Sequence, residues 1–169
     1  TSVRIVVRRL AQPTPGRGRA VCQDATVHVT AKADYAMRAI VEISVAPDGR
    51  AKAEQIAAAQ DIPLGFLRGI LTDLRRAGLI VSQRSATGGF RLARPAEEIT
   101  IAEVIRSVEG PLALVRGLRP TELDYPGPTA PLRDVWVALR ANLRAVLDHT
   151  TIADVAGGQL PAIVQQLAA

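Results

Sequence analysis

The sequence is poor in residues that bind metals or form disulfides. Among 169 residues there is one cysteine, Cys22, and the only histidines are His28 and His149. A single cysteine cannot close an internal disulfide, and structural zinc and iron–sulfur sites need three or four such ligands from the chain. We therefore expect no metal or other cofactor. The scarcity of cysteine also fits a reducing compartment.

Long apolar runs are missing as well. No stretch approaches the roughly 18–20 apolar residues that cross a membrane. Residues 1–10 carry three arginines, which is unlike the apolar core of a secretory signal. We therefore expect a cytoplasmic protein with no membrane partner. The sequence also contains no nucleophile–base pair, phosphate-binding loop or metal motif, so we expect no enzymatic activity.

Lysine is scarce, and arginine supplies nearly all of the positive charge. The net charge is +5, but it is unevenly distributed along the chain. Residues 61–95 hold six Arg against only Asp61 and Asp73, whereas residues 96–169 carry more carboxylates than cations. A basic segment in an otherwise balanced chain is typical of a protein that binds a polyanion. The alternative is a solvated surface in which arginine replaces lysine.

Apolar spacing predicts three helices before this basic segment ends. The first covers about 31–45, with Thr30 placed to cap it, and the second is short, at about 53–60. The turn Asp61-Ile62-Pro63 leads into a third helix over 64–77. One face of the third helix carries apolar residues at the spacing i, i+3, i+4, i+7, namely Leu67, Ile70, Leu71 and Leu74.

A β-hairpin and a long helix are predicted next. Residues 79–83 and 90–93 are apolar or β-branched and flank a turn with Gly88-Gly89, which indicates a hairpin, or wing. The fold class is therefore mainly α with a small β-wing, a winged helix-turn-helix followed by a long C-terminal helix over about 131–149. That helix has an apolar stripe of Leu132, Trp136, Leu139, Leu143 and Val146.

The exposed first turn of the third helix is the expected point of contact with DNA bases. A helix about 10–12 Å across fits the major groove, and this turn exposes Gly65, Phe66 and Arg68. An arginine can bind guanine O6 and N7 through two hydrogen bonds. The alternative is that the helix and hairpin serve only the core. The other expected contacts are Arg84, Ser85 and Thr87 at the minor groove or its backbone, and Thr30, Lys32 and Tyr35 at phosphates.

Several stretches of the sequence match a known pattern in order. They are HVTAKADYAMRA at 28–39, the residues 56–67, 74–84, 88–95 and 99–112, and a last match at 150–155. Together they resemble the IscR–NsrR–CymR family of bacterial winged-helix regulators, also called the Rrf-2 family, over about 28–158. The resemblance implies a homodimeric transcription factor, a repressor that binds a palindromic operator in double-stranded DNA. It also implies that the long C-terminal helices pair through their apolar stripes. Packing of the stripe within one subunit is the alternative.

The sequence departs from this family at informative positions. Many members hold an iron–sulfur cluster through three cysteines in the segment corresponding to 112–135, where this chain has none. Asp34 matches a carboxylate ligand of some members, but one carboxylate cannot hold a cluster. The resemblance therefore implies the cluster-free, cysteine-less branch, whose known member represses sulfur-metabolism genes and is tuned by a cysteine-biosynthesis enzyme. Arg68-Gly69 and Ser85 also differ from the usual residues, so the operator sequence cannot be carried over.

We expect three parts in the chain. Residues 1–27 form a flexible basic arm, residues 28–95 the winged helix-turn-helix DNA-binding domain, and residues 96–169 a helix, a variable loop and the dimerisation helix. The composition of the arm favours the hypothesis that residues 1–26 are not native folded sequence, with Val27 as a misread start. The alternative is an arm that adds phosphate contacts.

The expected partners besides DNA and a second subunit are a protein or small-molecule effector. A second functional hypothesis is a protein-interaction module. In it, the winged helix or the loop over 112–130 would dock a metabolic enzyme. Salt dependence separates the two hypotheses, because phosphate-driven binding weakens steeply with salt and apolar docking does not.

Overall fold

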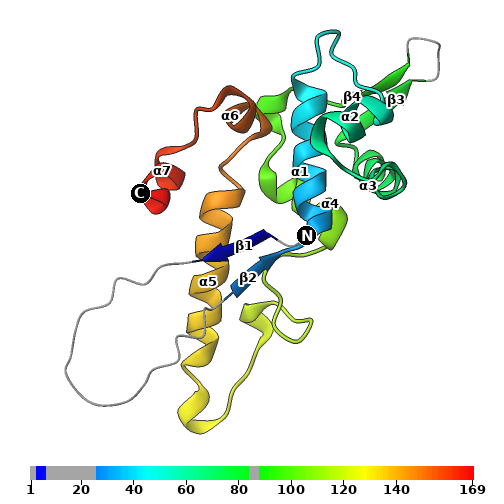
Figure 1. Ribbon diagram of the computed structural model, residues 1–169. Coiled ribbons are helices and arrows are strands. Elements are labelled where there is room, and N and C mark those ends of the chain that lie inside the picture. Colours follow the sequence, from blue (N-terminus) through cyan, green and yellow to red (C-terminus); the bar gives the residue numbers. More distant parts are fainter. Residues whose placement is uncertain (1–2, 7–25, 84–87) are drawn as a thin grey trace, which may run out of the picture.

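The structure is a computed structural model that describes residues 3–6, 26–83 and 88–169. It is mainly helical with small antiparallel strand pairs, which confirms the predicted fold class (Figure 1). The first elements in chain order are β1 (Val3–Val6), β2 (Thr26–Val29), α1 (Ala31–Ser44), α2 (Ala53–Gln60), α3 (Leu64–Arg76), β3 (Ile80–Gln83) and β4 (Gly89–Leu92). They are followed by η1 (Ala96–Glu98), α4 (Ile101–Glu109), η2 (Pro120–Glu122), η3 (Gly127–Thr129), α5 (Leu132–Leu147), α6 (Ile152–Gly157) and α7 (Ala162–Ala168).

The helices begin where the sequence supplies capping side chains. The Thr30 hydroxyl accepts a hydrogen bond from the Ala33 amide at 3.0 Å at the start of α1. Thr100 caps α4, and its backbone amide donates to Glu103 at 3.0 Å, which completes a capping box. Thr151 and Asp154 form the same arrangement at α6. Each box also explains why its helix begins at the following residue.

The two capping boxes lie side by side although the sequence separates them by about fifty residues. Thr100 and Thr151 face each other in an antiparallel bridge. The Ile101 amide donates to the Thr150 carbonyl, and the Ile152 amide donates to the Ile99 carbonyl, both at 2.9 Å. This pairing fastens α6, and with it the end of α5, to the start of α4. Sequence periodicity predicts neither this pairing nor its partners.

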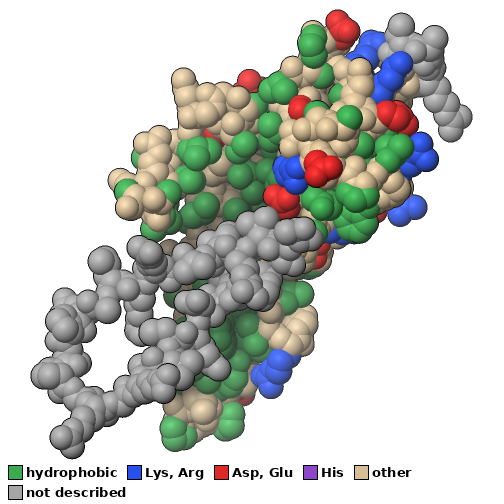
Figure 2. All heavy atoms as spheres, viewed as in Figure 1, with side chains coloured by type: hydrophobic (Ala, Val, Ile, Leu, Met, Phe, Trp, Pro, Cys, Tyr) green, Lys and Arg blue, Asp and Glu red, His purple; other side chains and the backbone are tan. Residues whose placement is uncertain are grey.

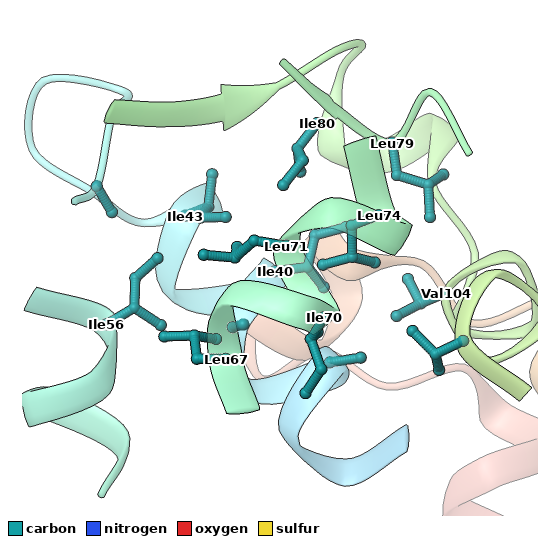
Figure 3. Packing of buried hydrophobic residues seen from close by; sticks show 14 of the residues in the cluster. Ile40, Ile43, Ile56, Leu67, Ile70, Leu71, Leu74, Leu79, Ile80 and Val104 are labelled. Carbon is teal, nitrogen blue, oxygen red and sulfur yellow. The ribbon is translucent and has the colours of Figure 1, made fainter. Parts of the chain in front are cut away.

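One hydrophobic core holds the winged-helix region together. Figure 3 shows buried side chains from α1, α2, α3, β3 and α4 meeting in a single cluster. The members include Ile40, Ile56, Leu71, Ile80 and Val104, each at most 1% exposed. The predicted stripe of α3 is the part of this helix that faces the core, and the opposite face is left at the surface.

The wing is anchored to the chain segment that precedes α2. β3 pairs with β4 in antiparallel register, from Ile80 opposite Leu92 to Gln83 opposite Gly89. Ala51 adds a further bridge to Phe90, with both backbone hydrogen bonds at 2.9 Å. A Cβ on Gly89 would lie 2.8 Å from the Ala51 carbonyl oxygen, so this close approach requires glycine. The base of the wing is therefore fixed relative to the helices.

Among the side chains that the structure describes, two further features add no buried residue to this core, although Val29 at the end of β2 packs against it. β1 and β2 form an antiparallel pair, from Val3 opposite Val29 to Val6 opposite Thr26, which the prediction of a flexible arm over 1–27 does not include. α5 is the longest helix and extends away from α1–α4 (Figure 1), and none of its 16 residues is buried. Within the part of the chain that the structure describes, no helix has the length and apolar character needed to cross a membrane.

Candidate nucleic-acid interface

The turn between α2 and α3 sets the position of the exposed helix. Asp61 adopts the left-handed conformation with φ of 50°, and the Ile62 amide returns to the Ala57 carbonyl at 3.0 Å. Ile62 is buried, which holds the turn against the core. The Leu67 amide bonds to the Pro63 carbonyl, so α3 begins directly after the proline. The sequence prediction of a helix-turn-helix is confirmed.

The outer face of α3 is open and basic. Phe66 is 47% exposed, and the side chains of Arg68 and Arg76 are 65% and 77% exposed. A Cβ added to Gly65 or Gly69 would meet no atom within 4 Å, so packing within this chain does not require either glycine. Glycine inside a helix costs about 1 kcal/mol relative to alanine. These two positions therefore leave room for something outside the chain to approach the helix backbone.

An aromatic pair connects α3 to α1. The rings of Tyr35 and Phe66 meet edge to face, with centroids 5.8 Å apart and an interplanar angle of 81°. The Arg38 guanidinium lies over the Tyr35 ring, 5.5 Å from its centroid, and also contacts Asp34 and Gln60. Two of the predicted DNA-contact residues, Tyr35 and Phe66, are thus brought together by the fold.

Among the described residues, the Arg68 side chain has one ion-pair partner. Its guanidinium lies 3.3 Å from a carboxylate oxygen of Glu54 on α2, and both side chains are largely exposed. A hydrogen bond from its own backbone amide, followed by the one from Arg68, holds the pKa of Glu54 below its ordinary value. Because exposed ion pairs contribute little to stability, Arg68 is able to exchange Glu54 for an outside partner.

Thr30 and Lys32 have partners within the chain, which the sequence does not predict. The Thr30 hydroxyl donates to Glu109 at 2.6 Å, at the end of α4. The Lys32 ammonium donates to the Val108 carbonyl at 2.9 Å and lies 2.9 Å from Asp73 of α3. These contacts join the start of α1 to α3 and α4. A phosphate at this helix terminus would have to compete with two carboxylates.

The remaining predicted contacts belong to the wing. Arg84, Ser85 and Thr87 lie outside the described residues. Two arginines that sequence reasoning did not select lie beside or on the described strands of the wing. Arg75, at the end of α3, donates to Ser82 of β3 at 3.5 Å, and Arg91 lies on β4. Figure 2 shows Lys and Arg side chains gathered at the edge of the molecule formed by α3 and the wing. The basic segment over 61–95 contains both α3 and the wing, so this grouping agrees with the uneven charge distribution of the sequence.

The stripe predicted on the long helix divides into two sets. Leu132 and Leu139 are 40% and 47% exposed, and Val135, which the prediction omitted, is 55% exposed. The members that are partly covered by their own chain are Trp136, Leu143 and Val146. The Trp136 indole donates to the Tyr125 hydroxyl at 3.1 Å. Leu132, Val135 and Leu139 follow a spacing of three and four, so they form one exposed apolar face of α5.

Sequence comparisons find similar proteins among transcriptional regulators. The family described as Rrf2, iron-dependent transcriptional regulator, matches residues 29–158. A protein of Mycobacterium tuberculosis that is named an HTH-type transcriptional regulator is 52% identical over 143 residues, which are 84% of this chain and 89% of that protein. CymR of Bacillus subtilis, also named an HTH-type transcriptional regulator, is 30% identical over 76% of this chain and 88% of its own length.

Solved structures agree with these relatives. CymR, described as the global cysteine regulator of B. subtilis, superposes with a TM-score of 0.67 at 28% identity and covers 78% of this chain and 98% of its own. IscR of T. potens superposes with a TM-score of 0.64 at 27% identity and covers 78% of this chain and 88% of its own. The comparisons thus match both the helical region and the wing.

The description of the family as iron-dependent can be tested on the side chains of this chain. Among the residues that the structure describes, no group of three or more His, Cys, Asp and Glu side chains could hold a metal ion. Asp34 contacts Arg38 at 3.3 Å, and Cys22 lies outside the described residues. The loop between α4 and α5 presents arginines rather than thiolates. The described residues do not fit an iron centre.

Proposed function

The chain belongs to the Rrf2 family and is a DNA-binding transcriptional regulator, and from this premise we propose that it represses transcription as a homodimer on a palindromic operator. Repression would follow from occupancy of the promoter, without catalysis. Each subunit would place α3 in the major groove of one half-site. The proposal rests on the open outer face of α3, where two glycines that intrachain packing does not require flank Arg68.

Arg68 would read a guanine in each half-site. Two hydrogen bonds to O6 and N7 discriminate against the wrong base by about 1–3 kcal/mol. In the free protein Arg68 is oriented by Glu54 at 3.3 Å, and both groups are exposed, so the exchange requires no rearrangement of the core. Gly65 and Gly69 would let the helix backbone approach the base edges closely. Phe66, held by Tyr35, would contact the methyl group of a thymine or the sugar edge.

The other contacts would position the protein on the DNA backbone. Arg84, Ser85 and Thr87 of the wing would lie at the minor groove, where negative potential is concentrated. Thr30, Lys32 and Tyr35 would face phosphates near the start of α1. Thr30 and Lys32 already have partners within the chain, so they would contribute less to phosphate binding than residues without such partners. We therefore assign most of the phosphate binding to arginines around α3 and the wing.

Pairing of α5 with its counterpart in a second subunit would form the dimer. The exposed face of Leu132, Val135 and Leu139 supports this assignment, because a large apolar face on a helix without buried residues is unfavourable in water. A twofold axis would then relate the two α3 helices, and half-sites would be separated by about one helical turn of DNA or a multiple of it.

The experiment that tests the proposal is recovery of sheared host DNA on the purified full chain, followed by sequencing. We expect one enriched palindromic motif whose half-sites are spaced by about one helical turn. Binding to that motif should weaken linearly with the logarithm of salt concentration. Recovery without any enriched motif would contradict the proposal, and enrichment of a motif without twofold symmetry would contradict the dimer.

A further inference from the structure

A hollow lined by arginines lies where α4, the following loop and α5 meet. Its volume is about 290 Å³, close to the lower end of the range for small-molecule sites. No acidic side chain of the described residues lines it. The lining residues are Arg106, Gly110, Pro111, Leu112, Arg119, Arg140 and Arg144. None of them belongs to the proposed DNA contacts or to the exposed face of α5.

The positive charge around this hollow is only partly compensated. Arg106 and Arg144 share one carboxylate, Asp148, at 3.0 and 2.7 Å. Arg140 donates to the Leu112 carbonyl at 2.6 Å. Within the described part of the chain, no carboxylate forms an ion pair with the Arg119 side chain. The Arg119 backbone amide donates to the Glu122 carboxylate, and its carbonyl accepts from the Glu122 amide, both at 2.8 Å. Among the described residues, these four guanidinium groups thus share one ion-paired carboxylate, Asp148.

A second hollow shares Arg106 and Arg144 with the first. It is also lined by three carboxylates, Glu98, Glu103 and Asp148, and by Arg94, which pairs with Glu103 at 2.6 Å. Hydrogen bonds from Arg144 and then Arg106 hold the pKa of Asp148 below its ordinary value, so this carboxylate is ionised at neutral pH. Three arginines thus stand against three carboxylates in the second hollow, whereas the described lining of the first has four arginines and no carboxylate, so the first is the one that would attract an anion.

The loop that forms one wall is held in a restricted conformation. Ala113 and Arg116 have φ of 54° and 53°, in the left-handed region that side chains other than glycine rarely adopt. Val115 and Leu118 exchange backbone hydrogen bonds of 3.0 and 3.1 Å, and Arg140 ties Leu112 to α5. Unfavourable backbone conformations of this kind persist where the surrounding structure enforces them, which is common at ligand sites. Contacts within the chain thus hold the loop that supplies Pro111, Leu112 and Arg119 to the hollow.

We propose that this hollow binds a small dianionic oxyanion, such as sulfate, phosphate, a phosphate ester or a dicarboxylate. Guanidinium groups bind such anions through paired N–H donors in a plane. Arg119 and Arg140 would supply the new contacts, and Arg106 and Arg144 would add the field of their uncompensated charge. The space beside Pro111 and Leu112 accommodates a short apolar part of an organic anion.

The site would also connect the two halves of the molecule. α4 packs against α1 and α3, which carry the DNA contacts, whereas α5 carries the exposed face assigned to the dimer. An anion bound between α4 and α5 would therefore change how the winged helix is set relative to the dimer axis. This regulatory consequence rests on the proposed function. Binding of the anion does not.

The test is isothermal titration of the full chain with sodium phosphate, sodium sulfate and sodium succinate, with sodium chloride keeping the ionic strength constant. We expect saturable binding of at least one dianion. Arg119→Gln and Arg140→Gln should each weaken it by at least about tenfold, which corresponds to 1.4 kcal/mol. The matched control is Arg133→Gln, because Arg133 also lies on α5 and donates to a loop carbonyl, that of Thr121 at 3.2 Å, but does not line the hollow.

The three anions distinguish the sources of the ligand. Binding of phosphate and sulfate alone would indicate a tetrahedral oxyanion, and binding of succinate alone a dicarboxylate. Absence of saturable binding for all three, or an equal loss in Arg133→Gln, would overturn the proposal. Thermal unfolding of each variant shows whether it is folded. If Arg140→Gln does not fold, Arg119→Gln decides the test, because the Arg119 side chain forms no ion pair within the described residues.

A separate measurement keeps this proposal distinct from the proposed function. Arg68→Gln should lose affinity for the operator and still bind the anion. Arg119→Gln should lose affinity for the anion, and in the absence of anion it should bind the operator as the wild type does. Loss of anion binding in Arg68→Gln would place the anion on the DNA-binding face and contradict the assignment to the hollow. If the wild-type chain binds the anion but no operator DNA, the proposed function is contradicted and the anion site is not.

Discussion

The winged-helix region and α5 are both helical and rich in apolar residues, yet they differ in what those residues contact. α1 and α3 each bury a row of side chains, among them Ile40 and Leu71, in one core. α5 is longer than either helix and buries none. Since burial of a large apolar side chain contributes about 1.5–3 kcal/mol, the first region has its own source of stability. The second keeps an exposed apolar face, and within the described residues it packs against η2, α4 and α7.

The largest effect that this comparison predicts is on the core. Leu71→Ala removes a side chain that is 1% exposed, and should lower the free energy of unfolding by about 2–5 kcal/mol because a cavity remains. Urea unfolding followed by circular dichroism measures it. In the matched variant Leu139→Ala, on exposed α5, the stability of the monomer should change by less than about 0.5 kcal/mol. Equal losses in the two variants would contradict the distinction between the regions.

The next effect concerns self-association. Leu139→Glu places a charge on the exposed face of α5 and should raise the dimer dissociation constant by at least about tenfold, since an unpaired charge in an apolar interface is unfavourable. Sedimentation velocity over a concentration series measures it. Leu167→Glu on α7, at a side chain that is 70% exposed, is the control and should leave the dimer intact. A wild-type chain that sediments as a monomer at every concentration would contradict the proposal that α5 forms the dimer interface.

On the DNA-binding face, Arg68→Ala should lower operator affinity by about 1–3 kcal/mol and relax the preference for one guanine in each half-site. Fluorescence anisotropy with the operator, and with that base pair replaced, measures both. Arg116→Ala removes an arginine whose guanidinium lies over Tyr125, 5.5 Å from the ring centroid and away from α3. It should change neither quantity. Unaltered base preference in Arg68→Ala would assign Arg68 to the phosphate backbone instead.

The wing should contribute less than α3. Arg84→Ala is expected to weaken operator binding more than Arg116→Ala and to reduce the slope of affinity against salt concentration by about one, as for a lost phosphate contact. The same anisotropy assay, repeated at several salt concentrations, measures the slope. Equal behaviour of the two variants would exclude the wing from the interface.

The smallest effect concerns the ion pairs where α5 ends. The pKa of Asp148 is lowered in the folded state by Arg144 and Arg106, so its stabilising effect is present above the unfolded value, near 3.8, and is lost as pH falls through the folded value. Asp148→Asn should therefore cost below about 1 kcal/mol at pH 7, because both arginines are partly exposed. The difference from wild type should vanish at the acid end of a pH series of urea unfolding curves. A difference that grew toward low pH would contradict this sign.

Much of the fold follows from local sequence patterns. The spacing of Leu67, Ile70, Leu71 and Leu74 predicts α3, and the glycine-containing turn predicts the wing, because helices and hairpins depend on residues a few positions apart. The capping boxes at Thr100 and Thr151 are likewise visible in sequence. Their mutual pairing is not, since a backbone bridge between distant segments leaves no spacing signal.

The candidate site was predicted in outline only. The exposed turn of α3 was found from the helical period, but Glu54 beside Arg68 and the contacts of Lys32 with Asp73 and Val108 were not. Single charged residues at distant positions carry no pattern that pairs them. The arginine-lined hollow was missed for the same reason, because Arg106, Arg119, Arg140 and Arg144 lie in three separate segments.

The sequence by itself determined which segments become helices and strands, which face of each helix is apolar, and that the chain resembles winged-helix regulators. Only the tertiary structure decided which arginines stand together, which are occupied by carboxylates, and which apolar stripe stays uncovered. The physical reason is one of range. Periodicity and capping act over a few residues, whereas the compensation of a charge or the covering of an apolar face depends on whatever the folded chain brings next to it.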